Sequence, residues 1–425
     1  MNKFLGCLVF LSMTTSIALA QSGSDSPYSQ FGLGDLTDQG VGFNKGMGGV
    51  GIAFRKGNEV NPLNPASYSS IDSVTMIFDA GFSGQLTNFK ENNKKENATS
   101  GGFDYVVASL RVIRNLGFSF GVMPYSNIGY GYSTSTSLSD VNATVSSSYS
   151  GEGGLSQIFV GAGYRVLKPL SVGFNVAYLW GDYRKTVQTS GGTYVNTLSK
   201  QYEADISSYR LEVGAQFEQA IGKNERLTIG ATFSPGHKLG SDPLRRIINT
   251  NSTISKADTT TFTVSDGLEL PTTFGVGLGW QHGATLRFGA DFKMQQWGSL
   301  SYPADVDGGY ALKSDLLKDS YAVNVGAEWM PNPMSRRLLG HVRYRIGAGY
   351  STPYYYINGK DGPKQLHLSL GFGVPIMNGY NNRSILNVSA SWQHRSADQL
   401  ITENTFRINI GLTFNERWFA KWKVE

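Results

Sequence analysis

The chain of 425 residues contains little cysteine, little charge and no long apolar run after its first twenty residues. Its single cysteine, Cys7, lies near the start, so the remainder has no disulfide, thiol nucleophile or thiolate metal site. Charged residues make up 16%, and the histidines are scattered without metal-ligand spacing. These histidines are His237, His282, His341, His367 and His394. We therefore expect no cofactor and no bound metal.

The lack of long apolar runs helps to decide whether the start of the chain is an export signal or a membrane anchor. A spanning helix needs roughly 20 apolar residues, and no run after Ala20 approaches that length. At the start, Lys3 precedes an apolar stretch, and residues 17–20 end in small side chains. This order predicts a signal peptide over residues 1–20, cleaved after Ala20. The rival, a membrane anchor, would need a longer segment and a stop-transfer pattern. Loss of Lys3 takes the formal charge from +5 to +4, which gives no argument for nucleic acid as a partner.

Glycine and aromatic residues are abundant instead. The chain has 52 glycines, and Phe, Trp and Tyr make up 12%. Together with few charges, this composition suits a transmembrane β-barrel, in which lipid-facing and lumen-facing side chains alternate. A soluble all-β sandwich could share the composition, so the pattern along the chain has to decide.

Apolar and polar residues alternate with a period of two in one segment after another. One face of residues 170–180 carries Leu170, Val172, Phe174 and Val176, and residues 406–414 repeat the pattern. This period indicates strands with one apolar face. About fourteen such segments occur, which is an even number that can close as an antiparallel barrel. They span 72–87, 102–113, 116–133, 142–166, 170–184, 200–219, 226–236, 272–281, 284–297, 320–330, 341–351, 365–375, 384–394 and 404–415.

The connections alternate between tight turns and long polar stretches. Turns are expected at 114–115, 168–169 and 282–283, and long loops near 90–101, 185–199, 237–271, 298–319 and 352–364. Outer-membrane barrels have short periplasmic turns and long extracellular loops, whereas a sandwich has no reason to sort them. The fold expected over residues 72–425 is therefore an all-β transmembrane antiparallel barrel in the cell outer membrane, ending in a short periplasmic tail.

Residues 21–71 do not have the pattern of a barrel strand. They are rich in glycine and then contain Asn61, Pro62, Asn64, Pro65 and Ala66, whose two Asn-Pro steps cannot pair as a strand. The segment is either a disordered tail or a plug inside the barrel. Its apolar residues favour burial, so we expect an N-terminal plug, or hatch, over 21–71.

The chain resembles the FadL family of outer-membrane hydrophobic-compound transporters. The resemblance rests on 46–49 (Gly-Met-Gly-Gly) leading to 64–66 (Asn-Pro-Ala), and on 270–277 followed by 289–292 and 296–297. Secretion-associated barrels similar to PorV share this fold. The resemblance implies fourteen strands, an N-terminal hatch, and passage of fatty acids or other apolar molecules sideways into the membrane.

A lateral route needs a break in the barrel wall. Pro124 lies within the third expected strand, and proline cannot donate to a sheet ladder, so it marks a bulge, edge or kink. The resemblance implies a kink here that acts as a gate. Gly129 and Gly131 follow and would allow close approach of a backbone or ligand. The alternative is an ordinary bulge.

Charges opposite the apolar faces are expected to point into the lumen. A fatty-acid carboxylate would need a cation that its neighbours do not neutralise. Candidates for this role are Arg287, Lys293, Arg343, Arg345 and Arg407. The alternative is that these charges pair with nearby carboxylates and line a wet lumen.

Two enzyme-like patterns are not supported by their context. A dinucleotide-binding pattern at 46–51 has no strand before it and no helix after it, and a nucleophile-elbow pattern at 117–121 lies within a strand. We therefore expect no enzyme.

Two functions remain open. The first is a channel for passive uptake of long-chain fatty acids or other hydrophobic molecules, with membrane lipid and the ligand as partners. The second is a non-transporting barrel that serves a protein secretion or assembly complex. An aromatic and basic tail over 418–423 could touch such a partner protein.

Overall fold

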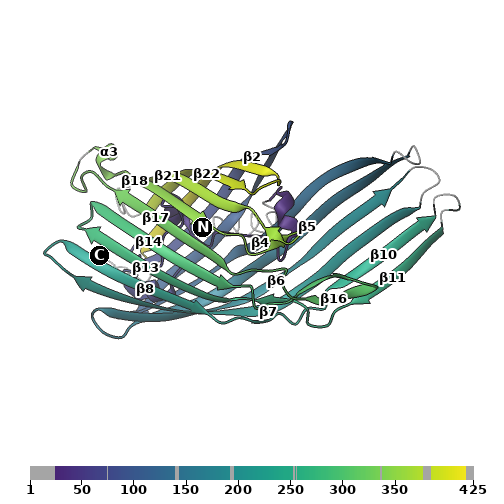
Figure 1. Ribbon diagram of the computed structural model, residues 1–425. Helices are drawn as coiled ribbons and strands as arrows, with labels where there is room; N and C mark the ends of the chain where they lie inside the picture. The colour runs from purple at the N-terminus through teal and green to yellow at the C-terminus, as the bar shows by residue number, and fades with distance from the viewer. Residues whose placement is uncertain are drawn as a thin grey trace, which may run out of the picture.

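A computed structural model describes residues 24–417, except 74, 139–142, 192–195, 252–253, 255, 336 and 377–383. The expected signal peptide and the C-terminal tail lie outside the described residues. Among those described, fourteen strands form a single antiparallel wall (Figure 1). They are β2 (Thr75–Glu91), β3 (Lys94–Ile113), β4 (Leu116–Leu138), β5 (Ala143–Arg165), β6 (Leu170–Ser190), β7 (Thr197–Ala220), β8 (Glu225–Ser234), β13 (Thr272–His282), β14 (Leu286–Gln296), β17 (Ser320–Trp329), β18 (Arg343–Ser351), β21 (Lys364–Ile376), β22 (Ser384–Ser396) and β23 (Thr402–Arg417).

The wall closes on itself. Each strand pairs with its neighbour in the order above, and β23 returns to β2, from Thr75 opposite Arg417 to Lys90 opposite Thr402. Closure pairs the first wall strand with the last, so neither end of the sheet is left as a free edge. The predicted fourteen-stranded antiparallel barrel is therefore confirmed.

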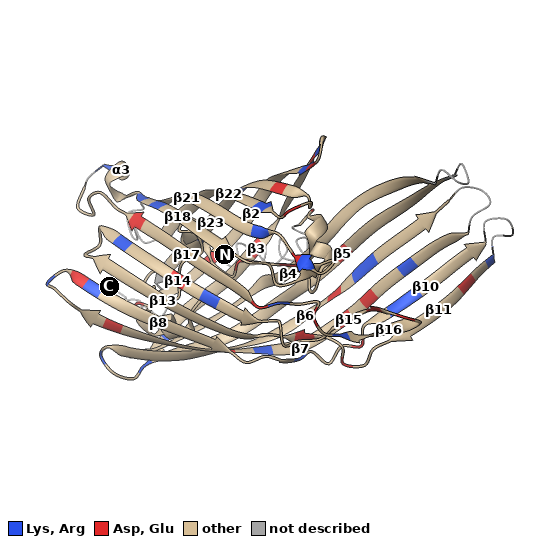
Figure 2. Ribbon diagram, in the orientation of Figure 1, with Lys and Arg blue, Asp and Glu red and all other residues tan. Residues whose placement is uncertain are grey.

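The outer face of this wall is apolar. On β6, Val172, Phe174, Val176 and Tyr178 are 39–51% exposed, whereas Asn175 and Ala177, which lie between members of this row, are buried. Other strands repeat this alternation, and charged residues are sparse along the wall (Figure 2). An apolar belt around a closed barrel is the surface that a bilayer solvates. Among the described helices, none is both long and apolar enough to cross a membrane.

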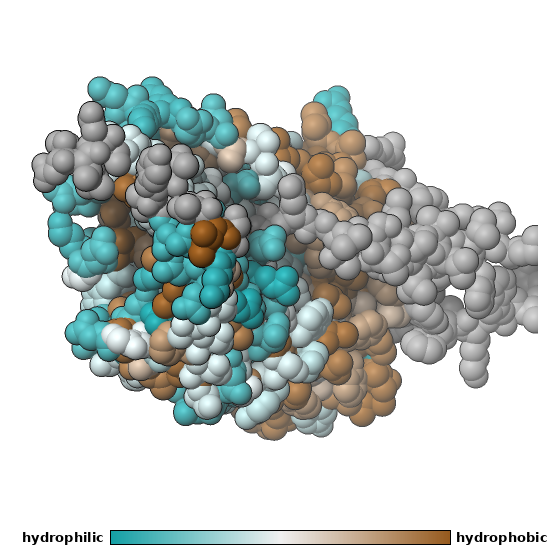
Figure 3. All heavy atoms as spheres, turned by 90° about the vertical axis from the view of Figure 1, so that its right-hand side faces the viewer, coloured by the Kyte–Doolittle hydropathy of each residue, from teal (hydrophilic) through white to brown (hydrophobic). Residues whose placement is uncertain are grey.

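One end of the barrel has mostly short connections, as at 114–115, 166–169, 221–224 and 283–285. An exception is 330–342, which contains α3 (Leu338–His341). The other end carries small paired strands: β9 (His237–Lys238) with β12 (Glu269–Leu270), β10 (Leu244–Asn251) with β11 (Lys256–Thr263), β15 (Tyr302–Val306) with β16 (Gly309–Lys313), and β19 (Tyr356–Ile357) with β20 (Lys360–Asp361). Figure 3 views the molecule from the side of β10 and β11, where hydrophilic colours are prominent.

Two stretches expected as loops are strand instead. Residues 90–101 and 185–199 mostly continue β2, β3, β6 and β7, with a turn at 92–93 between the first two; residues 192–195 lie outside the described residues. In Figure 1 the long strands β4 to β7 extend to the right well beyond the other wall strands, and β10, which pairs with β7, lies there with β11. The distal halves of β4 to β7 are rich in Ser and Thr and lack an apolar face. The strand ladder continues there because its hydrogen bonds are made by the backbone.

Residues 24–71, called the N-terminal segment below, lie inside the barrel. Their regular pieces are η1 (Pro27–Gln30), β1 (Asp35–Leu36), α2 (Gly42–Lys45) and η2 (Pro65–Ser70). The wall faces the segment with glycines that leave room for its backbone: a Cβ on Gly347 would lie 2.1 Å from Gly48 N, and one on Gly117 would lie 2.0 Å from Tyr68 O. We call these the seat glycines: Gly117, Gly163, Gly173, Gly214, Gly230, Gly277, Gly289, Gly326, Gly347 and Gly371. Their strands lie on opposite sides of the wall, so the segment is enclosed by it.

Candidate functional site

The wall is interrupted between β3 and β4. Their pairing runs from Ile113 opposite Leu116 to Val106 opposite Val122 and goes no further among the described residues. Both strands are irregular where they part. The β2–β3 register shifts between Gly81 and Phe82, and the β4–β5 register shifts between Pro124 and Ser126. Bulges bend and twist a strand locally, so two bulges at one level account for the separation.

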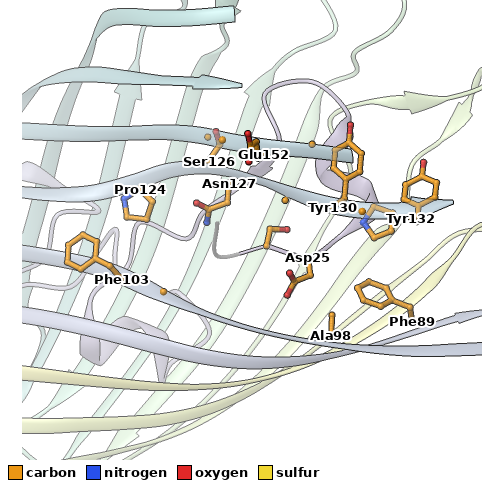
Figure 4. Close-up of a pocket in the computed structure, with 18 of the residues that line it drawn as sticks. Asp25, Phe89, Ala98, Phe103, Pro124, Ser126, Asn127, Tyr130, Tyr132 and Glu152 are labelled. Carbon is orange, nitrogen blue, oxygen red and sulfur yellow. The ribbon is translucent and has the colours of Figure 1, made fainter. Parts of the chain in front are cut away.

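A cleft of about 1540 Å³ occupies this interruption, and we call it the wall cleft (Figure 4). Phe82 lines it and is 47% exposed on the outer face, whereas Ser24 lines it and is buried at the start of the N-terminal segment. Phe103 packs edge-on against Phe82, with ring centroids 5.9 Å apart. The cleft therefore joins the lipid-facing surface to the interior.

The N-terminal segment covers part of the edge that β3 leaves. On β4, Asn127 and Ser126 pair with β1 in antiparallel register. Thr37 N donates to Tyr125 O at 3.0 Å, and Thr37 Oγ1 donates to Pro124 O at 2.6 Å. Gly129 N donates to Ser29 Oγ at 3.1 Å. Near Pro124, β4 thus exchanges a wall strand for the internal segment as its partner.

The structure places the gate candidates of β4 at the wall cleft. Pro124, Gly129 and Gly131 all line it, and a Cβ on Gly131 would meet nothing within 4 Å. Sequence reasoning missed Asp25, which also lines the cleft. The Oδ2 atom of Asp25 is buried and has no hydrogen-bond partner among the described residues. An isolated acidic residue near the start of the chain gives no pattern by which to find it.

The Asn-Pro residues lie elsewhere and fix the shape of the segment. Asn61 Nδ2 donates to Gly51 O at 2.7 Å and to Phe54 O at 2.8 Å, while Asn64 Nδ2 donates to Ile52 O at 2.8 Å. The remaining three are Pro62, which lines an inner pocket, and Pro65 and Ala66, which are buried in η2 against β5 to β7. None of the five lines the wall cleft.

Three of the five predicted head-group cations are neutralised. Arg287 Nη1 lies 3.0 Å from Glu59 and its Nη2 lies 2.8 Å from Glu328. Arg343 also pairs with Glu59, and Arg345 Nε lies 2.7 Å from Glu328. Glu59 comes from the N-terminal segment, so this cluster ties the segment to β14, β17 and β18. Its role was not predicted, because a lone carboxylate in the segment carries no motif.

The other two predicted cations differ from these. Arg407 Nε donates to Gln85 Oε1 at 2.9 Å. Lys293 forms no ion pair with any described residue. It lines two inner pockets of about 40 and 70 Å³, and Met123 lines both the larger of these and the wall cleft. Lys293 is therefore the candidate without a direct ion pair among the described residues, although the carboxylates of Glu212 and Asp38 lie close enough to act on its charge.

The enzyme-like patterns have other uses in the fold. Ser119 of the 117–121 pattern is buried and donates to Ala108 O at 3.0 Å. In the 46–51 pattern, Gly51 N donates to Asp291 Oδ2 at 2.7 Å, and Ile52 N donates to the same oxygen at 2.9 Å. These backbone amides thus already donate to a carboxylate of the wall. Among the described residues no group of His, Cys, Asp and Glu is placed to hold a metal ion.

A closed fourteen-stranded wall with an apolar belt and an internal segment defines an outer-membrane β-barrel with the fold of the FadL-family channels. The chain matches the BamG family model over residues 1–425 and belongs to the BamG family. No curated protein matches it.

Solved structures with this fold include the toluene transporter TodX of Pseudomonas putida, with 14% identity and a TM-score of 0.63 over 91% of this chain and 100% of that one. A FadL homologue of Pseudomonas aeruginosa has 10% identity and a TM-score of 0.62 over 89% and 99%. The toluene transporter TbuX of Ralstonia pickettii has 15% identity and a TM-score of 0.59 over 89% and 98%. At sequence identities this low, the similarity shows a shared fold and nothing more.

Proposed function

We propose that this protein is an outer-membrane channel through which hydrophobic small molecules reach the bilayer by a lateral opening between β3 and β4. The observation that carries the proposal is the end of β3–β4 pairing at Val106 and Val122, with a cleft that reaches the lipid-facing Phe82. Two of the structurally similar proteins are titled toluene transporters, which supports this class of ligand.

In this proposal the N-terminal segment is a plug, and the wall cleft provides the route. The two inner pockets beneath it hold only about 40 and 70 Å³, so an apolar molecule would follow the wall rather than the barrel axis. Where the molecule is a fatty acid, Lys293 is the residue we assign to its carboxylate, because Lys293 forms no direct ion pair with a described residue and could donate a charge-assisted hydrogen bond. Met123 separates that cation from the cleft.

The test measures small molecules retained by the mildly purified full chain, by mass spectrometry, together with binding of toluene and palmitate. Phe103→Ser removes an aromatic wall of the cleft, whereas Phe292→Ser removes a lipid-facing aromatic on β14 as a matched control. Losing the contact with a buried aromatic costs about 1.5–3 kcal/mol, so we expect binding to fall about tenfold or more in the first variant. Binding should be unchanged in the second.

The gate itself is tested with Pro124→Ala, which restores a backbone donor where β4 leaves β3. We expect this variant to change the set of retained compounds and to slow toluene entry into proteoliposomes. Absence of retained apolar molecules, with equal toluene entry in protein-free vesicles, would refute the channel.

A second candidate function is an accessory barrel in a protein secretion or assembly complex. It is favoured by the filled interior: the N-terminal segment is tied to three strands through Glu59 and packs on the seat glycines all around the wall. Copurification of a protein partner after cross-linking, with no retained apolar molecule, would favour this function over the channel.

A further inference from the structure

The strands beside the wall cleft present two unpaired sheet edges. Residues 94–105 of β3 pair with β2 alone, and residues 130–138 of β4 pair with β5 alone among the described residues. Their backbone groups facing the cleft have no ladder partner. An open edge is a template for another strand, and hydrocarbon cannot satisfy its N–H and C=O groups.

The chain already fills part of this edge with an added strand. β1 pairs with β4 at Ser126 and Asn127, and hydrogen bonds from Thr37 and Ser29 extend the contact over 124–129. Beyond Gly129 no described backbone group pairs with this edge of β4, although Tyr132 OH donates to Gln30 Oε1 at 3.2 Å. The edge of β4 from 130 to 138 could pair with about 30 Å of extended chain, at roughly 3.3 Å per residue.

The size of the cleft also suits an extended chain. Its volume of about 1540 Å³ exceeds the roughly 300–1,000 Å³ of ordinary small-molecule sites. A monoaromatic molecule would leave most of this space empty. An extended polypeptide could occupy its length and pair with its edges.

Charge indicates the chemistry of the occupant. The lining contains five carboxylates against one basic residue, Lys94. The carboxylates belong to Asp25, Glu91, Glu96, Glu152 and Asp182. Figure 4 shows the rings of Phe89, Tyr130 and Tyr132 along the same stretch as Asp25. Aromatic faces and carboxylates together favour cationic side chains.

We propose that the wall cleft is a docking site for an extended, lysine- or arginine-bearing segment of a partner protein, which adds as a strand to the edge of β4 beyond Gly129. Backbone hydrogen bonds would hold this segment, and its basic side chains would meet the acidic lining. This mode of binding is β-augmentation, in which the ladder provides affinity and the side chains provide selectivity. The inference goes beyond uptake of hydrophobic molecules and does not depend on it.

The experiment uses the full chain in nanodiscs and three labelled ten-residue peptides. The first alternates lysine and valine, the second alternates glutamate and valine, and the third is the lysine peptide with alternate backbone amides N-methylated. Fluorescence anisotropy should show saturable binding of the first peptide, at least tenfold tighter than binding of the other two. A photoreactive group on the bound peptide should label β4 within 130–138.

Variants of the protein distinguish binding at the wall cleft from non-specific electrostatic attraction of the basic peptide. Asp25→Asn combined with Glu152→Gln should weaken the lysine peptide at least fivefold, while Asp258→Asn on the exposed strand β11 should leave it unchanged. Equal binding of the N-methylated peptide, or equal loss in both variants, would overturn strand addition at this edge. Failure of every peptide, while toluene still binds, would overturn this inference and leave the proposed channel standing. Binding of the lysine peptide without binding of toluene would refute the channel and support the docking site.

Discussion

Glu59 lies 4% exposed between Arg287 and Arg343, where it balances charge inside the barrel. Removing one partner of a buried ion pair leaves an uncompensated charge, which typically costs about 3–5 kcal/mol. We expect Glu59→Gln to lower the free energy of unfolding by about that amount, as measured by thermal and denaturant unfolding in detergent. Glu218→Gln is the control, because its partner Arg226 is 61% exposed and lies 3.9 Å away. That pair should contribute at most about 1 kcal/mol. Equal losses in both variants would contradict a buried cluster.

For single residues, the sequence predicts which way a side chain points but not which residue it contacts. The two-residue period correctly predicts that Arg287 and Arg345 face inward, because strand geometry alone decides this. It cannot show that Glu59, more than two hundred residues earlier, lies beside Arg287. Such a contact depends on the path of an irregular segment that has no period to follow. For the same reason the period does not distinguish Lys293 from Arg287, Arg343 and Arg345, whose surroundings are different.

The hairpin of β15 and β16 shows how a loop is fixed above the barrel. Asp305 Oδ2 lies 2.9 Å from Lys200 Nζ and accepts from Tyr202 OH at 3.0 Å, while its Oδ1 lies 2.9 Å from Arg245 Nη1. Partial burial opposes ionisation, but the hydrogen bonds from Lys200, Arg245 and Tyr202 hold the pKa of Asp305 below its ordinary value.

This depressed pKa predicts how the hairpin responds to acid. Because the folded-state pKa lies below the unfolded-state value of about 3.9, the stabilisation is present above that value and is lost as the pH falls through the folded-state pKa. Hydrogen exchange of 302–313 should therefore speed up as the pH falls below about 4, after correction for the intrinsic exchange rate. In Asp305→Asn this additional acid response should be absent.

The fit between the N-terminal segment and the wall depends on the seat glycines. At Gly347 a Cβ would lie 2.1 Å from Gly48 N and 2.2 Å from Met47 C, whereas at Gly84 it would meet nothing within 4 Å. Gly347→Val should therefore displace the segment and make residues 24–71 accessible to protease. Gly84→Val should leave digestion unchanged. Protection of the segment in both variants would show that the wall can move to accommodate a side chain.

Barrel strands were the most predictable elements of this chain, and loops were the least. The expected strand over 365–375 matches β21 within a residue at each end, since its apolar alternation starts and stops with the strand. The expected loop at 185–199 is largely the continuation of β6 and β7. Its Thr, Ser and Gln residues have no apolar period, and pairing there depends on the neighbouring strand rather than on the segment itself.

For the molecule as a whole, the enclosed segment and the closed wall are expected to fold as one unit. A chain lacking 24–71 should lose the cluster around Glu59 and the contacts along the seat glycines. We expect it to migrate as unfolded protein in gel assays of heat modifiability, and a peptide of residues 24–71 added after folding should not restore it. Full recovery with the added peptide would show that the segment can enter a finished barrel.

The pairing of β2 with β23 joins the first and the last strand of the wall along the chain. The wall therefore cannot close until β23 has crossed the inner membrane. Throughout that interval the N-terminal segment, whose Met47, Val50 and Phe54 are buried in the folded protein, has no finished barrel to cover it. Its dwell time in the periplasm, rather than its final stability, would then set how much the cell depends on a carrier that keeps this stretch from aggregating.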